Sequence, residues 1–254
     1  MSKEFSGKVA LITGGGSNIG LAIATLLAER GASVALVGRN KEQLDQAAVN
    51  LRDRGNGIVL TVAADVTDES EIERAVDRVA AELGGLDIAV NNAGIVGAIG
   101  PLVDMKPDDF RKVLETNTVG TFLSMQSEIR AMKRAGSGVI VNTASNIGVH
   151  GRRLNMAAYA ASKAAVSVMT RNAALESINA GIRINAVSPG ATDTPLSFRP
   201  GEDAAARDAR VASAVPIGRV AKTSEIAEAV VWLASDRSSY VVGHDLVVDG
   251  GTTA

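Results

Sequence analysis

Short apolar runs alternate with helix-like patterns along almost the whole of this 254-residue chain. Strands that alternate with helices in this way favour an α/β fold, in which helices cover both faces of a parallel sheet. The predicted strands are residues 9–13, 33–37, 58–63, 86–91, 138–144, 183–188 and 246–249, and the predicted helices are residues 19–30, 41–54, 69–83, 110–134, 157–180 and 224–235.

The chain predicts a single domain over residues 1–254. Its length is sufficient for one well-buried core, and no Pro/Ser-rich linker divides it. The longest irregular stretch is residues 189–219, which contains an Ala/Arg/Asp-rich piece at 203–214 that favours a short helix. Because this stretch follows the carboxyl end of a predicted strand, we interpret it as a substrate lid.

Composition excludes several classes of function. Lys and Arg total 26 against 28 Asp and Glu, so no global basic field would attract nucleic acid. Cysteine is absent, and the only histidines, His150 and His244, lack metal-ligand spacing, so we expect no metal site and treat both as polar edge residues. The N-terminus has no apolar signal core and no segment is apolar enough to span a membrane, which predicts a soluble, cytoplasmic protein.

A glycine-rich turn at residues 13–20, TGGGSNIG, joins the first predicted strand to the first predicted helix. Backbone amides and the positive end of the helix dipole can hold a pyrophosphate there, and glycine lets the backbone approach it closely. The spacing is neither the G-x-G-x-x-G of most dinucleotide-binding proteins nor a P-loop. Taken alone, such a turn could equally serve packing.

Tyr159 is followed four residues later by Lys163, so on a helix the phenol and the ammonium project from one face. A neighbouring cation lowers the pKa of a phenol from its ordinary value of about 10. A downward shift of roughly two or three units needs about 3 to 4 kcal/mol, which one ammonium and a cationic cofactor ring could supply. In isolation, the pair would more often be a helix-edge Tyr and a solvated Lys.

The motifs along the chain follow the order of those in the short-chain dehydrogenase/reductase family. The glycine turn resembles T-G-x-x-x-G-x-G, and the resemblance covers almost the entire chain. It implies a Rossmann-like, doubly wound parallel sheet of about seven strands. The later motifs are Asp65-Val66-Thr67-Asp68, Asn91-Asn92-Ala93-Gly94, Asn117, Ser145, Tyr159 with Lys163, Ser188-Pro189-Gly190 and Val248-Asp249-Gly250-Gly251.

Two positions depart from the family pattern. Asn18 stands where the family usually has its middle glycine, and we expect the turn to survive because Asn tolerates positive φ comparatively well. Ser145 lies one residue farther from Tyr159 than the commonest spacing, which would instead select Asn146. Aligning Asn142 and Gly148 with the surrounding family pattern favours Ser145.

The resemblance implies a role for each of four residues. Tyr159 would be the general acid/base, and Ser145 would hold the substrate oxygen by a hydrogen bond. Lys163 would lower the pKa of the phenol and bind the nicotinamide ribose. Asn117 would hold an ordered water near Lys163, although a helix-interior Asn can instead satisfy backbone groups.

The cofactor is expected to be NADP, with NAD not excluded. Gly38 stands where NAD-preferring relatives usually carry an acidic residue, and Arg39 could pair with a 2'-phosphate. Arg39 could also merely face solvent, and Ser17 stands where many NADP-dependent relatives have a second basic residue. Asp65 is expected at the adenine, unless it only begins a turn. The residues expected at the cofactor are Gly14, Gly16, Ser17, Asn18, Ile19, Gly20, Arg39, Asp65, Val66, Asn91, Ala93, Gly94, Tyr159, Lys163, Pro189, Gly190, Thr192 and Thr194.

We therefore expect an oxidoreductase that interconverts a ketone or aldehyde and its alcohol, forming a homotetramer through helices 110–134 and 157–180. One alternative is reduction of 3-oxoacyl thioesters on a carrier protein. Ala180 weighs against it, because acyl-carrier reductases often have an arginine before the residue equivalent to Gly181. A second alternative is a nucleotide-binding regulatory protein without activity. For Arg152 and Arg153, in the loop between Ser145 and Tyr159, two interpretations stay open: contact with an anionic substrate, or simple solvation.

Overall fold

The computed structural model describes residues 3–55, 57–199 and 201–254, and a parallel sheet of seven strands lies at its centre. The strand order is β3-β2-β1-β4-β5-β6-β7, so the chain reverses its direction across the sheet between β1 and β4. This order confirms the predicted doubly wound sheet, whose ligand crevice opens at the carboxyl ends of the strands around the reversal. The strands are β1 Val9–Thr13, β2 Ser33–Gly38, β3 Val59–Ala63, β4 Ile88–Asn91, β5 Gly138–Thr143, β6 Ile182–Pro189 and β7 Asp245–Val248.

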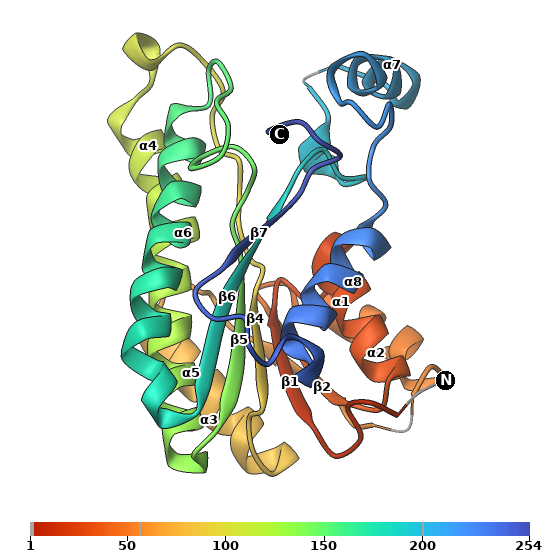
Figure 1. Cartoon of the computed structure of the whole chain (residues 1–254), viewed down its shortest axis with the longest axis vertical. Coiled ribbons are helices and arrows are strands. Elements are labelled where there is room, and N and C mark those ends of the chain that lie inside the picture. The colour runs from red at the N-terminus through yellow and green to blue at the C-terminus, as the bar shows by residue number, and fades with distance from the viewer. Residues whose placement is uncertain (1–2, 56, 200) are drawn as a thin grey trace.

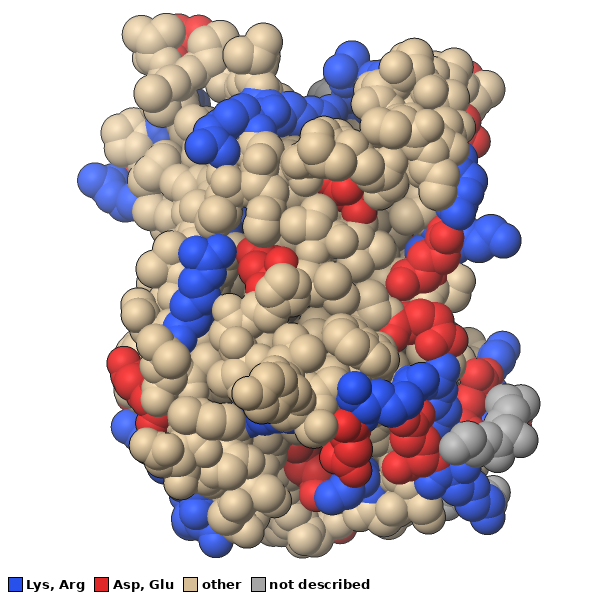
Figure 2. All heavy atoms as spheres, viewed as in Figure 1, with Lys and Arg blue, Asp and Glu red and all other residues tan. Residues whose placement is uncertain are grey.

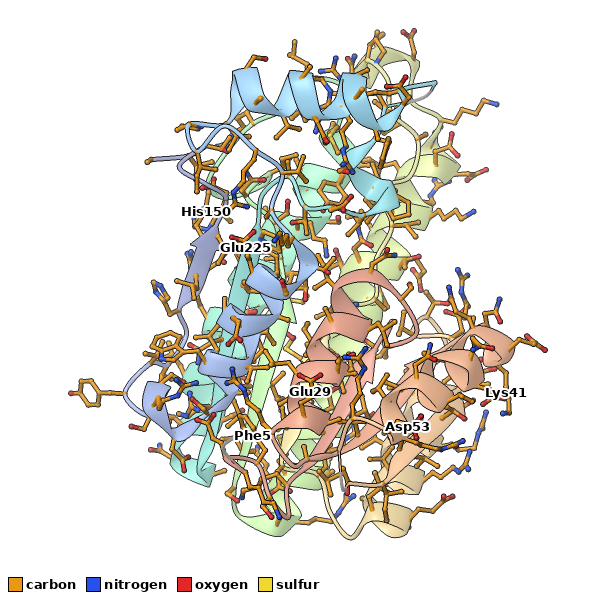
Figure 3. The ribbon with its side chains drawn as sticks, turned by 90° about the vertical axis from the view of Figure 1, so that its right-hand side faces the viewer. Phe5, Glu29, Lys41, Asp53, His150 and Glu225 are labelled. Carbon is orange, nitrogen blue, oxygen red and sulfur yellow. The ribbon has the colours of Figure 1, made fainter. Side chains whose placement is uncertain are left out.

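Helices cover both faces of the sheet (Figure 1). Successive residues of β1 point to opposite faces, so Ala10 and Ile12 enter the core beneath α1, α2 and α8, while Val9 and Leu11 enter the core beneath α3 and α5. Figure 3 looks onto the first of these faces, with Glu29 on α1. The α-helices are α1 Asn18–Glu29, α2 Lys41–Arg52, α3 Glu69–Leu83, α4 Pro107–Leu114, α5 Gly120–Ala135, α6 Ala157–Ser177, α7 Ala204–Ala214 and α8 Thr223–Ala234.

Three helices begin at side-chain caps that are visible in the sequence. The side chains of Asn40, Asp68 and Asp203 each accept a hydrogen bond from a backbone amide in the first turn of α2, α3 and α7, respectively. Such caps satisfy amides that have no partner within the helix. The helices predicted over 41–54 and 69–83 begin at the same residues as α2 and α3, and the second also has the bounds of α3, whereas the helix predicted over 110–134 begins three residues after α4 does.

The prediction of one continuous helix over residues 110–134 is wrong at residues 115–119. A π-helical turn, Glu115–Val119, separates α4 from α5 and contains Asn117. The amide of Asn117 reaches out of this turn and bonds to both the N–H and the C=O of Ile95, at 2.8 Å each. Such single π-turns are frequent at functional sites.

The predicted lid, residues 189–219, contains a short 3-10 helix, Pro195–Ser197, and α7; residue 200 lies outside the described residues. Arg207 of α7 fastens this segment, because its guanidinium lies 2.6 Å from Asp193 and over the ring of Phe198. In Figure 1, α7 lies apart from the helices that cover the sheet, near the carboxyl end of the chain. No helix in the described ranges is long and apolar enough to cross a membrane.

Candidate active site

Two cavities open at the carboxyl edge of the sheet and share Gly94 in their walls. The first, of about 560 Å³, is lined by the glycine turn and by the residues that follow β2 and β3; we call it the glycine cleft. The second, of about 400 Å³, is lined by the loops after β5 and β6 together with Tyr159 and Lys163; we call it the tyrosine pocket. Together they form one continuous candidate site at the position that the strand order indicates.

The glycine turn has no room for side chains at its key positions. Gly14 has a φ of 65°, and a methyl group there would lie 2.9 Å from the Asn92 amide nitrogen. A methyl group at Gly20 would overlap the Gly14 carbonyl oxygen, so helix α1 can approach the turn only because residue 20 has no side chain. Asn18 adopts a φ of 48°, the left-handed conformation expected of it. The amino end of α1 is thus presented to the cleft.

Ser145, Tyr159 and Lys163 meet in the wall of the tyrosine pocket. Tyr159 and Lys163 lie one turn apart on α6, and Ser145 comes from the loop after β5, where its hydroxyl is close enough to the phenol to affect the phenol's pKa. Asn146, the alternative to Ser145, donates instead to Asp249 at 3.2 Å. The structure therefore places Ser145, rather than its neighbour, against the phenol.

The pKa of Tyr159 differs from the expectation. Burial raises the pKa of the phenol above its ordinary value, and the hydrogen bond from Ser145 only partly opposes this effect. The Nζ of Lys163 donates a hydrogen bond to the Thr143 carbonyl oxygen at 2.7 Å. Burial also lowers the pKa of Lys163 to about 8. The phenol is therefore protonated at neutral pH, as a proton donor must be.

Asn117 holds a loop in place. Besides its two bonds to Ile95, its amide donates to the Ser162 hydroxyl at 2.9 Å. A methyl group at Gly94 would lie 3.1 Å from the Asn117 side-chain oxygen and 3.3 Å from Lys163 Nζ. Both amide protons of Asn117 are donated within the protein, so the residue fastens the loop after β4 beside Lys163.

Asn91 does not line either cavity, contrary to the expectation. Its side chain is buried and donates to Glu128 at 2.9 Å and to Asn142 at 3.0 Å. The next residue, Asn92, lines the tyrosine pocket and bonds to the carbonyl oxygens of Thr13 and Gly14. Asn91 still pairs with the neighbouring strands, so its side chain is directed into the protein, and only the residues beyond the strand reach the crevice.

Arg39 lies at the outer end of the glycine cleft. It follows Gly38, and its guanidinium is exposed and 3.8 Å from the carboxylate of Asp65. The other oxygen of that carboxylate accepts hydrogen bonds from the N–H and the hydroxyl of Thr67. Asp65 therefore begins a turn, which was the alternative to its expected place at the adenine. No carboxylate stands at residue 38, and the exposed side chain of Arg39 lines the cleft.

Most of the remaining predicted residues line one cavity or the other. Neither cavity wall includes Asn18, Gly20, Asn91 or Asn117. The glycine cleft includes Gly14, Gly16, Ser17, Arg39, Asp65, Val66, Ala93 and Gly94, and the tyrosine pocket includes Ile19, Gly94, Ser145, Tyr159, Lys163, Pro189, Gly190, Thr192 and Thr194. The sequence did not identify Met156, Thr252 and Thr253, which also line the pocket, and no local motif marks them.

His150 is not the edge residue expected from the sequence. Its Nε2 lies 3.0 Å from the Asp245 carboxylate, whose side chain is 2% exposed and also accepts bonds from Ser167 and Ser188. The loop before α6 is therefore tied to β7, next to the strand end that supplies Pro189. His244 is exposed, as expected.

Residues 14–253 match a family model described as enoyl-(acyl carrier protein) reductase. The chain is 46% identical to cis-4-hydroxycyclohexanecarboxylate dehydrogenase of Sinomonas cyclohexanicum over all of both chains. It is 38% identical to cyclohexanol dehydrogenase of Acinetobacter sp. strain SE19, covering 100% of this chain and 98% of the other. The crystal structure of levodione reductase superposes with a TM-score of 0.93 at 38% identity, covering 98% of each chain.

The chain therefore belongs to the short-chain dehydrogenase/reductase family, as its motifs predicted. It is an oxidoreductase that interconverts alcohols and carbonyl compounds. The family implies a nicotinamide dinucleotide, and the residues present fit one, because the side-chain-free turn and the amino end of α1 suit a pyrophosphate. The tyrosine pocket beyond Gly94 would receive the nicotinamide end.

Proposed function

We propose that this protein interconverts a cyclic secondary alcohol and its ketone, with NADP as the cofactor. One observation carries the proposal: Ser145, Tyr159 and Lys163 meet in a pocket that is continuous with the glycine cleft at Gly94. Two relatives named for cyclohexane alcohols support a ring substrate. An apolar lining supports it as well, with Val96, Ile147, Met156, Leu196, Val211 and Val215 around the pocket.

Each catalytic side chain has one task in this proposal. Tyr159 gives its phenolic proton to the carbonyl oxygen during reduction and takes one from the alcohol during oxidation. Ser145 holds that oxygen while negative charge develops on it. Lys163 binds the nicotinamide ribose of the cofactor. Asn117 positions the loop after β4, which lies beside Lys163. The bound nicotinamide supplies or accepts the hydride.

Arg39 selects NADP over NAD in this proposal. Its guanidinium is exposed at the mouth of the glycine cleft, where a bidentate pair with a 2'-phosphate is possible. Gly38 provides no carboxylate to repel that phosphate. Asp65 lies 3.8 Å from Arg39, and this distance is long enough for the guanidinium to exchange it for a phosphate.

Residues 189–219 act as the substrate lid. α7 brings Arg210, Val211 and Ala214 into the wall of the pocket, so movement of this helix would change access to Tyr159. We also propose a homotetramer assembled through α5 and α6, because Phe122, Val168 and Leu175 are large apolar side chains left exposed on these helices. Its dependence on an intracellular dinucleotide supports a cytoplasmic location.

Steady-state kinetics tests the proposal. Purified protein is assayed with cyclohexanol and cyclohexanone, open-chain analogues and a 3-oxoacyl thioester, each with NADP(H) and with NAD(H). We expect turnover of the ring compounds and a lower KM for NADP. Preference for the thioester would favour the carrier-protein alternative, and tight nucleotide binding without turnover would favour the regulatory one.

A further inference from the structure

Several arginines line the tyrosine pocket. Arg152, Arg153, Arg199 and Arg210 contribute to its wall, and no Asp or Glu does so among the residues that the structure describes. Figure 2 shows basic side chains in the hollow between the lobe of α7 and the opposite lobe of the molecule. A neutral cyclic alcohol has no charged group that these arginines could bind.

Two of these arginines are already engaged by the protein. Arg210 makes a two-pronged ion pair with Glu202, with both N–O distances at 2.7 Å. Arg152 donates to the carbonyl oxygens of Gly148 and Gly151, so it braces the loop before α6. Arg210 is therefore committed to Glu202, whereas Arg152 uses one nitrogen, Nη1, to hold this loop.

Arg153 and Arg199 are not neutralised. Within residues 3–55, 57–199 and 201–254, no carboxylate lies within 4.0 Å of either guanidinium. Arg153 belongs to an exposed loop, yet burial of its guanidinium lowers its pKa; the nearby charges of Arg210 and Arg199 lower that pKa further, and the carboxylate of Glu202 opposes them. Glu202 is already paired with Arg210, so this group of arginines keeps a net positive charge that an anion in the pocket would offset.

We propose that the substrate carries a carboxylate, which Arg153 binds together with Arg199 at the end of the pocket away from Tyr159. This inference rests on the proposed function and names its substrate class: hydroxy- and oxo-cycloalkane carboxylates. A guanidinium matches the two oxygens of a carboxylate, and the lid residue Arg199 would join the loop residue Arg153 across the bound anion. The carboxylate thus fixes which end of the ring meets Ser145 and the phenol.

Paired substrates test this assignment. Oxidation of 4-hydroxycyclohexanecarboxylate is compared with that of 4-methylcyclohexanol, which places a neutral methyl group where the acid has its carboxylate. We expect wild type to prefer the acid in kcat/KM. Arg153→Gln should lose about 10- to 100-fold of kcat/KM on the acid, mainly through KM, and under threefold on the neutral alcohol. Arg199→Gln should act in the same direction, whereas Arg52→Gln, an exposed control on α2, should change neither substrate.

Equal losses on both substrates, or no loss on either, would overturn the assignment. Wild-type inhibition provides a second measurement that needs no variant: cyclohexanecarboxylate should inhibit at least tenfold more tightly than cyclohexanecarboxamide, and equal inhibition would also overturn it. Oxidation of the neutral alcohol without a preference for the acid would reject the carboxylate site alone. Tight carboxylate binding without turnover of either alcohol would reject only the proposed function.

Discussion

The amide of Asn91 donates a hydrogen bond to the carboxyl group of Glu128 across 2.9 Å, in the interior between β4 and α5. Glu128 is fully buried, and this burial raises its pKa to about 7 although the bond from Asn91 opposes the shift. Glu128 Oε1 and Asn91 Oδ1 have no other partner within the described part of the chain. A protonated carboxyl group adds the donor that this pair lacks.

Stability should consequently fall as pH rises from about 5 to 7. In this range the unfolded chain releases the Glu128 proton, near the ordinary pKa of 4.5, while the folded protein keeps it until about pH 7. The free energy of unfolding should drop by roughly 3 kcal/mol and then level off. Urea denaturation at pH 5, 6, 7 and 8 measures this. Glu128→Gln, which cannot ionise, should lack this component; an unchanged slope in the variant would contradict it.

Replacing Tyr159 by Phe should abolish turnover while cofactor binding persists. The change removes one hydroxyl from the pocket wall, and general acid–base catalysis of this kind contributes about 100- to 10,000-fold. The measurements are kcat and the dissociation constant for NADPH. Tyr240→Phe is the matched control, because Tyr240 is fully exposed and is the only other tyrosine. Near-native activity of the Tyr159 variant would reject this residue as the proton donor.

Replacing Arg39 by Asp should shift cofactor preference towards NAD. The new carboxylate would repel a 2'-phosphate and bond to a ribose hydroxyl, so affinity for NADPH should fall by about 10- to 100-fold. Fluorescence titration with NADPH and NADH measures both affinities. Lys41→Ala serves as the control, since Lys41, which is labelled in Figure 3, is not among the residues that line the cleft and pairs with Asp45. Unchanged NADPH affinity in the Arg39 variant would remove Arg39 from the phosphate site.

The left-handed backbone at Asn18 predicts an ordered response to substitution. Asn18→Gly should keep the stability and cofactor affinity of wild type, because glycine accepts a φ of 48° without strain. Asn18→Ala should lower the free energy of unfolding by about 1 kcal/mol, since Cβ disfavours this conformation. Urea denaturation compares the three proteins. Equal stability of the Ala and Gly variants would show that the turn relaxes to another conformation.

Elements with a local signal could be predicted from the sequence. The caps Asn40 and Asp68 mark helix starts, and a short apolar run marks β1, so these elements have nearly the expected bounds. The family order of motifs also located the phenol, the ammonium and the glycine turn. The choice of Ser145 over Asn146 rested on an alignment of neighbouring residues, and the structure places its hydroxyl against the phenol.

Features that depend on distant contacts could not be predicted. His150 pairs with Asp245, 95 residues further along the chain. No local pattern in the sequence indicates that β7 lies close to the loop that contains His150. The direction of Asn91 follows from its pairing with β1 and β5, which only the assembled sheet defines.

The π-helical turn at Glu115–Val119 also bears on how this chain tolerates changes in length. One additional residue in the turn rotates α5 by about 100° relative to a continuous α-helix. Deleting a residue here would leave a regular helix. The rotation would then break either the hydrogen bonds between Asn117 and Ile95 or the packing of the apolar side of α5 against the sheet. Insertions and deletions in this stretch should therefore be tolerated far less than exchanges of one side chain for another.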